Sequence, residues 1–414
     1  MANVESSRIF YGWWVVAAAF LNLFFVVGII FYGFPVFYAS FVESLGFTRA
    51  QVTQGFFLGF LIIGLPSGLI AGAVIDRIGA RWVIVTGAAL VAGSLALMAR
   101  MTKLWEYEAL CVMEVLGYVL AGPIANQVLV SKWFRARRGR AMGLAYLGLG
   151  AGGVASPLLV NYLIRTYGWR HALETIAIAL AVVLLPVGIG VTRSSPEECG
   201  LQPDWEGAAA YEVSAARAEV GSSAVTEAVQ TKTFWLILLG STLAIGAIGA
   251  VIQHFILFLK DKGYTASVAV RFSTGLLVAS LVGRILVGYA VDHVSKKNAM
   301  ALFYFLIGAS VLLLGMAKEP AAAWTFALIF GFSMGADYML VPLVTAECFG
   351  TGSLGKLLAL IIMGYSMGQW GLPWIVGKIF DAKHSYDLAW KVTAVAGMIG
   401  GLAIYAIKPA KAET

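Results

Sequence analysis

Charged residues and cysteine are scarce in this chain of 414 residues. Asp, Glu, Lys and Arg make up 12% of the sequence, whereas hydrophobic residues make up 60%. A water-soluble protein of this size needs far more charge on its surface, so the composition excludes a soluble globular enzyme. Apolar runs of about 20 residues recur along the chain and predict an all-α membrane protein, because a β-barrel would show short alternating segments.

The three cysteines indicate neither a disulfide framework nor a metal site. Cys111, Cys199 and Cys348 are widely spaced, and two of them lie in or beside hydrophobic segments. We expect them to be small packing residues. No motif for a metal or an organic cofactor is present, and the proton is the one coupling ion that we expect.

The net charge of +7 does not indicate a nucleic-acid partner, because the cations lie in loops between apolar segments. The densest group, between 132 and 140, contains Lys132, Arg135, Arg137, Arg138 and Arg140. Such clusters are typical of cytoplasmic loops, so both termini are expected in the cytoplasm and the chain in the cytoplasmic (inner) membrane. The first segment lacks a cleavage site, and we expect it to be retained as a helix.

Twelve apolar segments predict twelve membrane-spanning helices. They are 11–40, 50–75, 82–100, 105–131, 140–164, 170–191, 233–259, 266–291, 298–316, 321–346, 356–379 and 386–407. The long polar segment 192–232 has the length and composition of a linker. It predicts an N-terminal bundle of six helices (1–191), a cytoplasmic linker (192–232) and a C-terminal bundle of six helices (233–414).

The two predicted halves are related in sequence. The segment "GAVIDRIGAR" (72–81) has a counterpart in "GYAVDHVSKK" (288–297), and "WFRARRGRAMG" (133–143) corresponds at the same offset to the segment 348–359. Fused repeats of this kind build many secondary transporters, in which the substrate binds between the repeats near the bilayer midplane. The repeat therefore predicts transport.

Arg284 lies inside the apolar segment "FSTGLLVASLVGRILVGYAVD". A charged side chain at this depth costs about 2.5 to 3.5 kcal/mol on insertion scales, so we expect it to face a polar cavity. Its planar guanidinium matches a carboxylate bidentately. Because Gly68 occupies the aligned position of the first half, the repeat itself does not require a cation there. The alternative is a purely structural ion pair.

Two other ionisable residues inside spans are candidates for proton coupling. Asp337 lies at a depth comparable with that of Arg284, so the two are expected to pair, either in a way that changes with conformation or permanently. His254 is the only histidine inside a hydrophobic segment, and imidazole exchanges protons near neutral pH. The alternative for His254 is a hydrogen-bonded packing residue.

Uncharged polar residues at cavity depth are expected to complete the substrate site. We predict contacts from Asn126, Tyr118, Tyr32, Tyr338, Tyr365, Ser366 and Gln369, since a small acid needs only a few hydrogen bonds beside its carboxylate. The alternative for each is a contact between helices. Asp76, Arg77, Arg81 and Asp292 are predicted to form a cytoplasmic gate, the alternative being ordinary solvation of a loop.

The "GAVIDRIGAR" segment resembles the G-x-x-x-D-R-x-G-x-R signature of the major facilitator superfamily. The segments "YGWWVVAAAF", "YGFPVFY" and "WFRARRGRAMGLAYLGLGAGG" resemble the monocarboxylate transporter family, and "SPEECGLQPD" is shared with the related oxalate/formate exchangers. The resemblance covers essentially the whole chain. It implies two pseudo-symmetric six-helix bundles and, as in bacterial lactate/pyruvate-type symporters, carboxylate binding by Arg284.

Two departures from the animal members of that family leave the proton-carrying residue open. Those members have a lysine just after the G-F-P of the first span and an aspartate four residues before the arginine. Here these positions are Val36 and Ser280.

One cavity cation favours one carboxylate, so the sequence predicts a monomeric, alternating-access proton symporter of small monocarboxylates such as lactate or pyruvate. The alternatives are an oxalate/formate-type exchanger and a non-transporting sensor. We do not expect an enzyme, because the sequence shows no nucleophile with an adjacent base.

Overall fold

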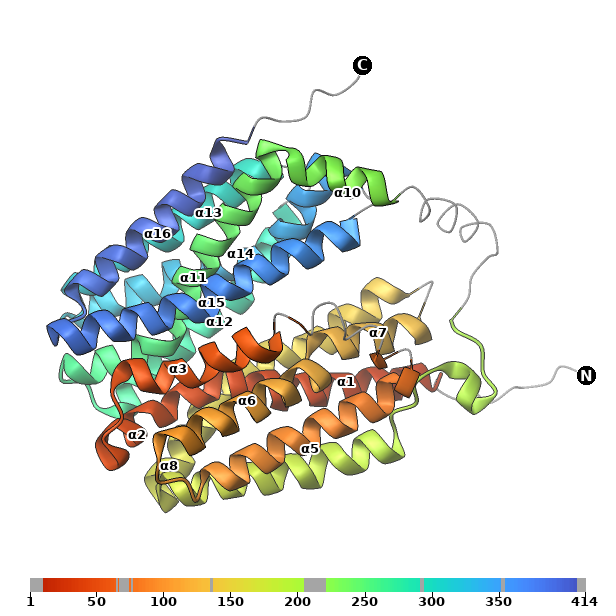
Figure 1. The fold of residues 1–414 in the computed structure, drawn as a ribbon, viewed down its shortest axis with the longest axis horizontal. Helices are drawn as coiled ribbons and strands as arrows, with labels where there is room; N and C mark the ends of the chain where they lie inside the picture. The colour runs from red at the N-terminus through yellow and green to blue at the C-terminus, as the bar shows by residue number, and fades with distance from the viewer. Residues whose placement is uncertain are drawn as a thin grey trace, which may run out of the picture.

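The computed structural model describes residues 10–64, 66, 74–75, 77–134, 137–204, 221–290, 294–350 and 354–407. Most residues in these ranges are helical. The β-structure that the described residues contain is an isolated β-bridge between Phe134 and Asp204. Figure 1 shows two helical bundles that lie side by side. The all-α membrane fold predicted from the sequence is therefore confirmed.

The N-terminal bundle begins with an irregular span. α1 (Gly12–Val27) continues through the π-helix η1 (Gly28–Gly33) and the 3₁₀-helix η2 (Phe34–Phe37) into α2 (Tyr38–Leu45). Pro35 contributes to the irregularity, because proline cannot donate an amide hydrogen bond. The bundle continues with α3 (Arg49–Gly59), η3 (Phe60–Gly64), α5 (Ala80–Met98), α6 (Leu104–Ala121), α7 (Pro123–Trp133) and α8 (Arg138–Gly190).

α8 contains two spans. Its 53 residues would make a straight helix of about 80 Å, more than twice the roughly 30 Å thickness of the hydrocarbon core. Gly168, with a φ of 79°, interrupts the helix, and the chain turns back there (Figure 1). A positive φ is readily adopted only by glycine, which accounts for the residue at this turn.

The C-terminal bundle follows η4 (Pro196–Cys199) and α10 (Gly221–Gln230). It contains α11 (Lys232–Asp261), α12 (Ala266–Ala290), α13 (Lys296–Val311), η7 (Leu312–Met316), α14 (Pro320–Phe349), α15 (Leu354–Lys383) and α16 (Asp387–Tyr405). Each of the twelve predicted ranges thus contains a described helix. Within the described residues, eight helices pass a length and hydropathy test for membrane spans, or nine if a bent pair within α14 counts as one.

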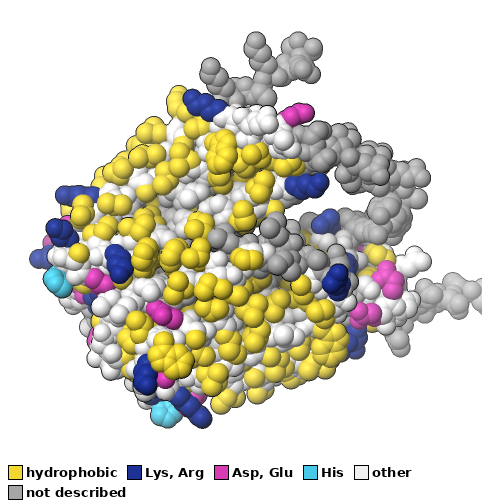
Figure 2. Space-filling view, viewed as in Figure 1, with side chains coloured by type: hydrophobic (Ala, Val, Ile, Leu, Met, Phe, Trp, Pro, Cys, Tyr) yellow, Lys and Arg dark blue, Asp and Glu magenta, His cyan; other side chains and the backbone are white. Residues whose placement is uncertain are grey.

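On the face shown in Figure 2, apolar side chains cover the middle of the molecule and charged side chains gather toward its two ends. Large apolar side chains such as Ile178, Val182 and Ile285 are 60 to 66% exposed. A surface of this kind is stable against lipid tails and unstable in water. The chain is therefore a multi-pass membrane protein.

The two bundles contact each other mainly through the helix pairs α3–α15 and α8–α12. They approach most closely at the end that carries α2 and diverge toward the end that carries α7 and α10 (Figure 1). The space-filling view shows a notch between the bundles on that second side (Figure 2). The bundle boundaries predicted at 191 and 232 stay predictions, since residues 205–220 of the linker lie outside the described part.

Candidate functional site

Arg284 lies at the interface of the two bundles. A narrow pocket is lined by Tyr32 of η1, Leu149, Gly150 and Gly153 of α8, and Leu277, Ser280, Leu281 and Arg284 of α12. The volume in which the centre of a water molecule fits is about 10 Å³, so the pocket holds roughly one water. The predicted carboxylate-binding residue therefore faces a small cavity whose walls come from both halves.

A close crossing of α12 and α14 fixes the backbone of Arg284. A Cβ atom on Gly335 would lie 2.8 Å from the backbone nitrogen of Arg284 and would collide with the carbonyl of Ser280. Only glycine allows two helices to approach this closely. Asp337 lies on the same helix, α14, and its carboxyl group interacts electrostatically with Arg284.

Asp337 is 7% exposed, and the hydroxyl of Tyr304 donates to its Oδ1 at 2.5 Å. It interacts electrostatically with Arg284, and Tyr304 interacts in the same way with Tyr365. The Ser241 hydroxyl lies 3.4 Å from the Tyr304 oxygen, and because the single Tyr304 hydrogen goes to Asp337, Ser241 is the donor of this longer hydrogen bond. Side chains from α11 to α15 thus form a continuous polar cluster beside the pocket, which joins three of the predicted site residues.

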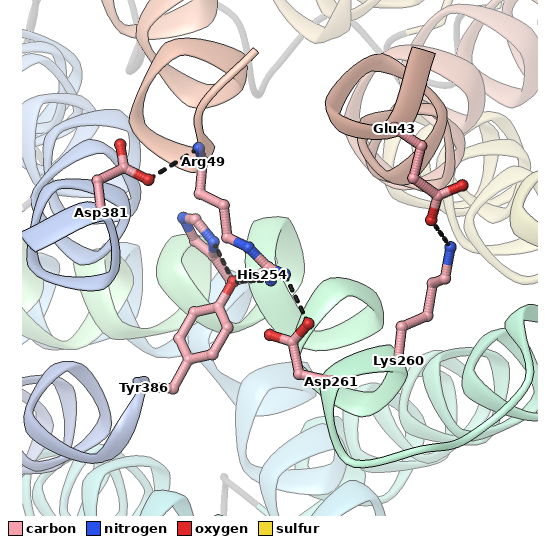
Figure 3. Close-up of polar contacts among 7 residues, drawn as sticks. All are labelled: Glu43, Arg49, His254, Lys260, Asp261, Asp381 and Tyr386. Atoms are coloured by element: carbon pink, nitrogen blue, oxygen red, sulfur yellow. Dashed lines mark hydrogen bonds and ion pairs between the residues drawn. The ribbon is translucent and has the colours of Figure 1, made fainter. Parts of the chain in front are cut away.

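His254 lies elsewhere in the C-terminal bundle, in a hydrogen-bonded chain shown in Figure 3. Its Nε2 lies 2.8 Å from the carbonyl oxygen of Pro373, and its Nδ1 lies 3.0 Å from the hydroxyl of Tyr386. A carbonyl only accepts, so Nε2 carries the hydrogen, and in the neutral ring Nδ1 accepts from Tyr386. Arg49 of the N-terminal bundle donates from Nη1 to the Tyr386 oxygen at 2.8 Å. His254 is completely buried, and its predicted role in proton coupling stays a prediction.

Several polar contacts join the bundles at the end that carries α2, which we call the closed end. Arg49 pairs with Asp261 at 2.6 Å, Lys260 pairs with Glu43 at 2.5 Å, and the hydroxyl of Tyr38 donates to Gln253 at 2.8 Å. Figure 3 shows both ion pairs between helices of different bundles. The Arg49 side chain is only 11% exposed, whereas the Glu43 side chain is 66% exposed, so the Lys260–Glu43 pair is an ordinary surface ion pair.

Asp381 completes the closed end by binding the N-terminus of α3. Its two oxygens accept from the backbone N–H groups of Arg49 and Ala50, each at 3.0 Å. The first N–H groups of a helix have no partner within the helix, and its dipole favours a negative charge there. A carboxylate of one bundle therefore caps a helix of the other.

Asn126 lines a second pocket, inside the N-terminal bundle. Its Nδ2 donates to the carbonyls of Ala121 and Gly122, both at 2.8 Å, and Asn22 also donates to Ala121. Ile84 and Thr192 are among the other lining residues. The structure therefore does not bring Asn126 to the pocket of Arg284, and its contact with substrate stays a prediction.

The remaining predicted residues either make contacts other than those of the Arg284 pocket or lie outside the described part of the chain. Tyr118 makes an edge contact with Phe60, and the hydroxyl of Ser366 donates to the carbonyl of Ile362 at 2.7 Å. The backbone of Gln369 lies against Gly249, where α11 and α15 cross. The side chain of Tyr338 and the gate residues Asp76 and Asp292 lie outside the described residues.

Of the other two predicted gate residues, Arg77 is exposed and Arg81 binds within its own bundle. The guanidinium of Arg81 donates to Ile189, and its backbone N–H donates to Ser194 at 3.1 Å. The four-residue gate stays a prediction. No cluster of His, Cys, Asp and Glu suited to a metal ion occurs in the described ranges.

The sequence analysis did not predict the closed end. Arg49, Asp261 and Asp381 stand at helix ends, where a charge is most simply explained by exposure to water. The signal in the sequence was that acidic and basic residues gather at predicted helix ends on the side opposite the basic loops. Sequence alone does not show that these ends face one another.

Comparison with known proteins agrees with the fold. The Major Facilitator Superfamily profile matches residues 19–370. Monocarboxylate transporter 13 of Rattus norvegicus is 27% identical over 406 residues, which cover 96% of this chain and 89% of the relative. Monocarboxylate transporter 12 of Homo sapiens is 26% identical, covering 74% of this chain and 63% of the relative. The MFS transporter asaE of Aspergillus flavus is 25% identical, covering 81% and 72%.

Among solved structures, a bacterial homologue of the human lysosomal transporter Spinster, in an inward-facing and unoccupied conformation, superposes with a TM-score of 0.69. The two sequences are 14% identical, and the match covers 97% of this chain and 96% of that one. Such a likeness concerns the fold alone. The profile match over most of the sequence shows that this chain belongs to the Major Facilitator Superfamily of transporters.

Proposed function

We propose that this protein is a secondary transporter of small monocarboxylates, such as lactate or pyruvate, that moves its substrate with a proton by alternating access. The observation that carries the proposal is the position of Arg284 in a pocket between the two bundles. Substrates of such transporters bind between the repeats. The names of the relatives at 26 to 27% identity support a monocarboxylate as the substrate.

The chemistry of the pocket suits one carboxylate and a short apolar body. The guanidinium of Arg284 forms two parallel hydrogen bonds with a carboxylate. Leu149, Leu277 and Leu281 line the same pocket with apolar groups. Tyr32 and Ser280 also line it, and their hydroxyls would orient a hydroxyl or keto oxygen of the substrate. The pocket is smaller than a lactate ion in this conformation, so the two bundles must separate slightly when substrate enters.

The closed end is the external end in this proposal. Both termini then lie in the cytoplasm, and the membrane is the cytoplasmic (inner) membrane, as the basic loops predict. Substrate reaches Arg284 from outside when the contacts of Arg49 and Asp381 break. It leaves toward the cytoplasm when they re-form and the opposite ends part. The proton travels with the anion, and Asp337 and His254 are the candidates for carrying it.

The proposal is tested by substituting Arg284 in purified protein reconstituted into liposomes. Arg284→Lys keeps the charge but loses the bidentate geometry, so we expect uptake of lactate to fall at least 100-fold and binding to become undetectable. Arg271→Lys is the matched control, because Arg271 lies on the same helix and is exposed. Uptake by Arg284→Lys equal to that of Arg271→Lys would contradict the assignment.

An oxalate/formate-type exchanger is the second candidate, favoured by one observation. Asp337 is held by Tyr304 and interacts with Arg284, as expected of a permanent partner that never releases a proton. Uptake driven by a pH gradient into vesicles without internal anion supports the symporter. Uptake that requires internal anion supports the exchanger.

A further inference from the structure

Glu114 is a buried carboxyl group that the proposed function does not use. It lies on α6 with no exposed surface, and neither of its side-chain oxygens has a hydrogen-bond partner in the described part of the chain. Ten residues separate it from Leu104, the first residue of α6. It therefore lies about 15 Å along the helix, close to the middle of a hydrocarbon core roughly 30 Å thick.

The groups that face Glu114 are neutral near pH 7. They are the hydroxyl of Tyr38 on α2 and, on α6 itself, the hydroxyl of Tyr107 and the thiol of Cys111. No Lys, Arg or His of the described parts of the neighbouring helices α1, α3, α5 and α7 is among its electrostatic partners. A carboxylate with neither a cation nor a donor is strongly disfavoured inside a protein. In this conformation Glu114 is therefore the neutral acid.

Glu114 differs in this respect from Asp337 and His254, the two candidates named above for carrying the proton. Asp337 accepts from Tyr304 and interacts with Arg284, so it tolerates a negative charge. His254 has partners on both ring nitrogens. Of the three groups, Glu114 is the one whose surroundings require a bound proton in this conformation.

One of the residues that interact with Glu114 belongs to the closed end. Tyr38 faces Glu114 and also donates to Gln253 of the other bundle. It directly follows η1 and η2, and π- and 3₁₀-turns inside a helix often mark hinges. Separation of the bundles at the closed end breaks the Tyr38–Gln253 hydrogen bond, which frees a side chain that interacts with Glu114.

We propose that Glu114 is a proton-binding site of the transport cycle. Water reaches its carboxylate and protonates it while the closed end is open, and the closed end then forms only over the neutral acid. The proton leaves to water on the other side of the membrane later in the cycle. This inference rests on the proposed function, because it names a residue that carries the proton of the symport.

The test uses the full chain in liposomes, with lactate as substrate and a pH-sensitive dye inside. Glu114→Gln mimics the permanently neutral acid. We expect it to exchange labelled for unlabelled lactate within twofold of the wild-type rate, because exchange needs no release of the proton. Accumulation driven by a pH gradient, and the accompanying internal acidification, should fall at least tenfold. Glu108→Gln is the matched control, since Glu108 lies on the same helix, is half-buried and accepts a hydrogen bond from Gln54.

The outcomes separate this inference from the proposed function. Wild-type protein that takes up lactate without moving protons refutes the symport, whatever the variant does. If wild type and Glu114→Gln both move protons with lactate to the same extent, the role of Glu114 is refuted and the symport is not. If Glu114→Gln also loses lactate exchange, the variant Glu114→Asp is measured next. Lactate exchange and proton movement that return in Glu114→Asp support the inference. Loss of both exchange and proton movement in Glu114→Asp overturns it.

Discussion

Asp381 offers the most direct test of how the closed end is held together. Its carboxylate accepts from two backbone N–H groups at the start of α3, those of Arg49 and Ala50. The substitution Asp381→Asn preserves the size of the side chain and removes the charge. An asparagine accepts through its one carbonyl oxygen, and its NH₂ group faces the other N–H, so one hydrogen bond is lost and the other becomes neutral.

The expected cost follows from the types of bond involved. A hydrogen bond to a charged group contributes about 1.5 to 3 kcal/mol and a neutral one about 0.5 to 1.5 kcal/mol. Replacing two charged bonds with one neutral bond at a half-buried site should therefore cost about 2 to 3 kcal/mol. Each 1.4 kcal/mol changes an equilibrium about tenfold, so the ratio of closed to open should fall roughly 30- to 150-fold. An open population of about 1% would rise to roughly 23 to 60%.

Pulsed electron paramagnetic resonance measures this shift directly. Spin labels attached after Ser44→Cys on α2 and Lys383→Cys on α15 report the separation of the bundles, in a background that carries Cys199→Ser and Cys348→Ser. We expect Asp381→Asn to add a population at longer distance. Asp387→Asn, an exposed acid at the same end, should leave the distribution unchanged. Identical distributions for Asp381→Asn and wild type would refute the capping argument.

Two further predictions concern the site of Arg284. Gly335→Ala should lower the thermal unfolding temperature, because its Cβ would collide with Ser280; such overpacking costs about 1 to 3 kcal/mol. The control is Gly315→Ala, where a Cβ meets no atom within 4 Å. Equal unfolding temperatures for the two variants would contradict the close crossing. Tyr304→Phe should lower the free energy of unfolding by about 1 to 3 kcal/mol, because it leaves a buried oxygen of Asp337 without its donor. Thermal unfolding measures this loss, with Tyr405→Phe as the control because Tyr405 is 66% exposed. An unchanged unfolding temperature would show that the hydrogen bond is replaced.

The membrane spans were predictable from the sequence because the hydrophobic effect alone is strong enough to determine them. Moving about 20 apolar residues out of water outweighs local propensities, so even the irregular first span was found from its hydrophobicity. Arg284 was predictable for the converse reason, since a cation inside such a segment needs a polar surrounding. Its location in a pocket between the bundles agrees with that argument.

The contacts between bundles were not predictable in the same way. Asp381 and Arg49 are more than 300 residues apart in the sequence, and their contact depends on how the two bundles meet. Glu114 was missed because the segment around it, "LWEYEALCVMEVLGYVLA", contains three glutamates. Two of them lie near the helix end and are ordinary capping or surface residues, and only packing distinguishes the third.

The irregular first span connects the two places where the bundles interact. Tyr32 of η1 lines the pocket of Arg284, and Tyr38, six residues later, belongs to the closed end. A ligand shifts a conformational equilibrium only by the difference between its affinities for the two states. In the proposed function, a carboxylate held between Arg284 and Tyr32 would contact both bundles, so its affinity would change when they rock. Because Tyr38 moves with the same segment, binding at the pocket and closure at the far end share one mechanical element, and a substitution that only loosens η1 should weaken both together.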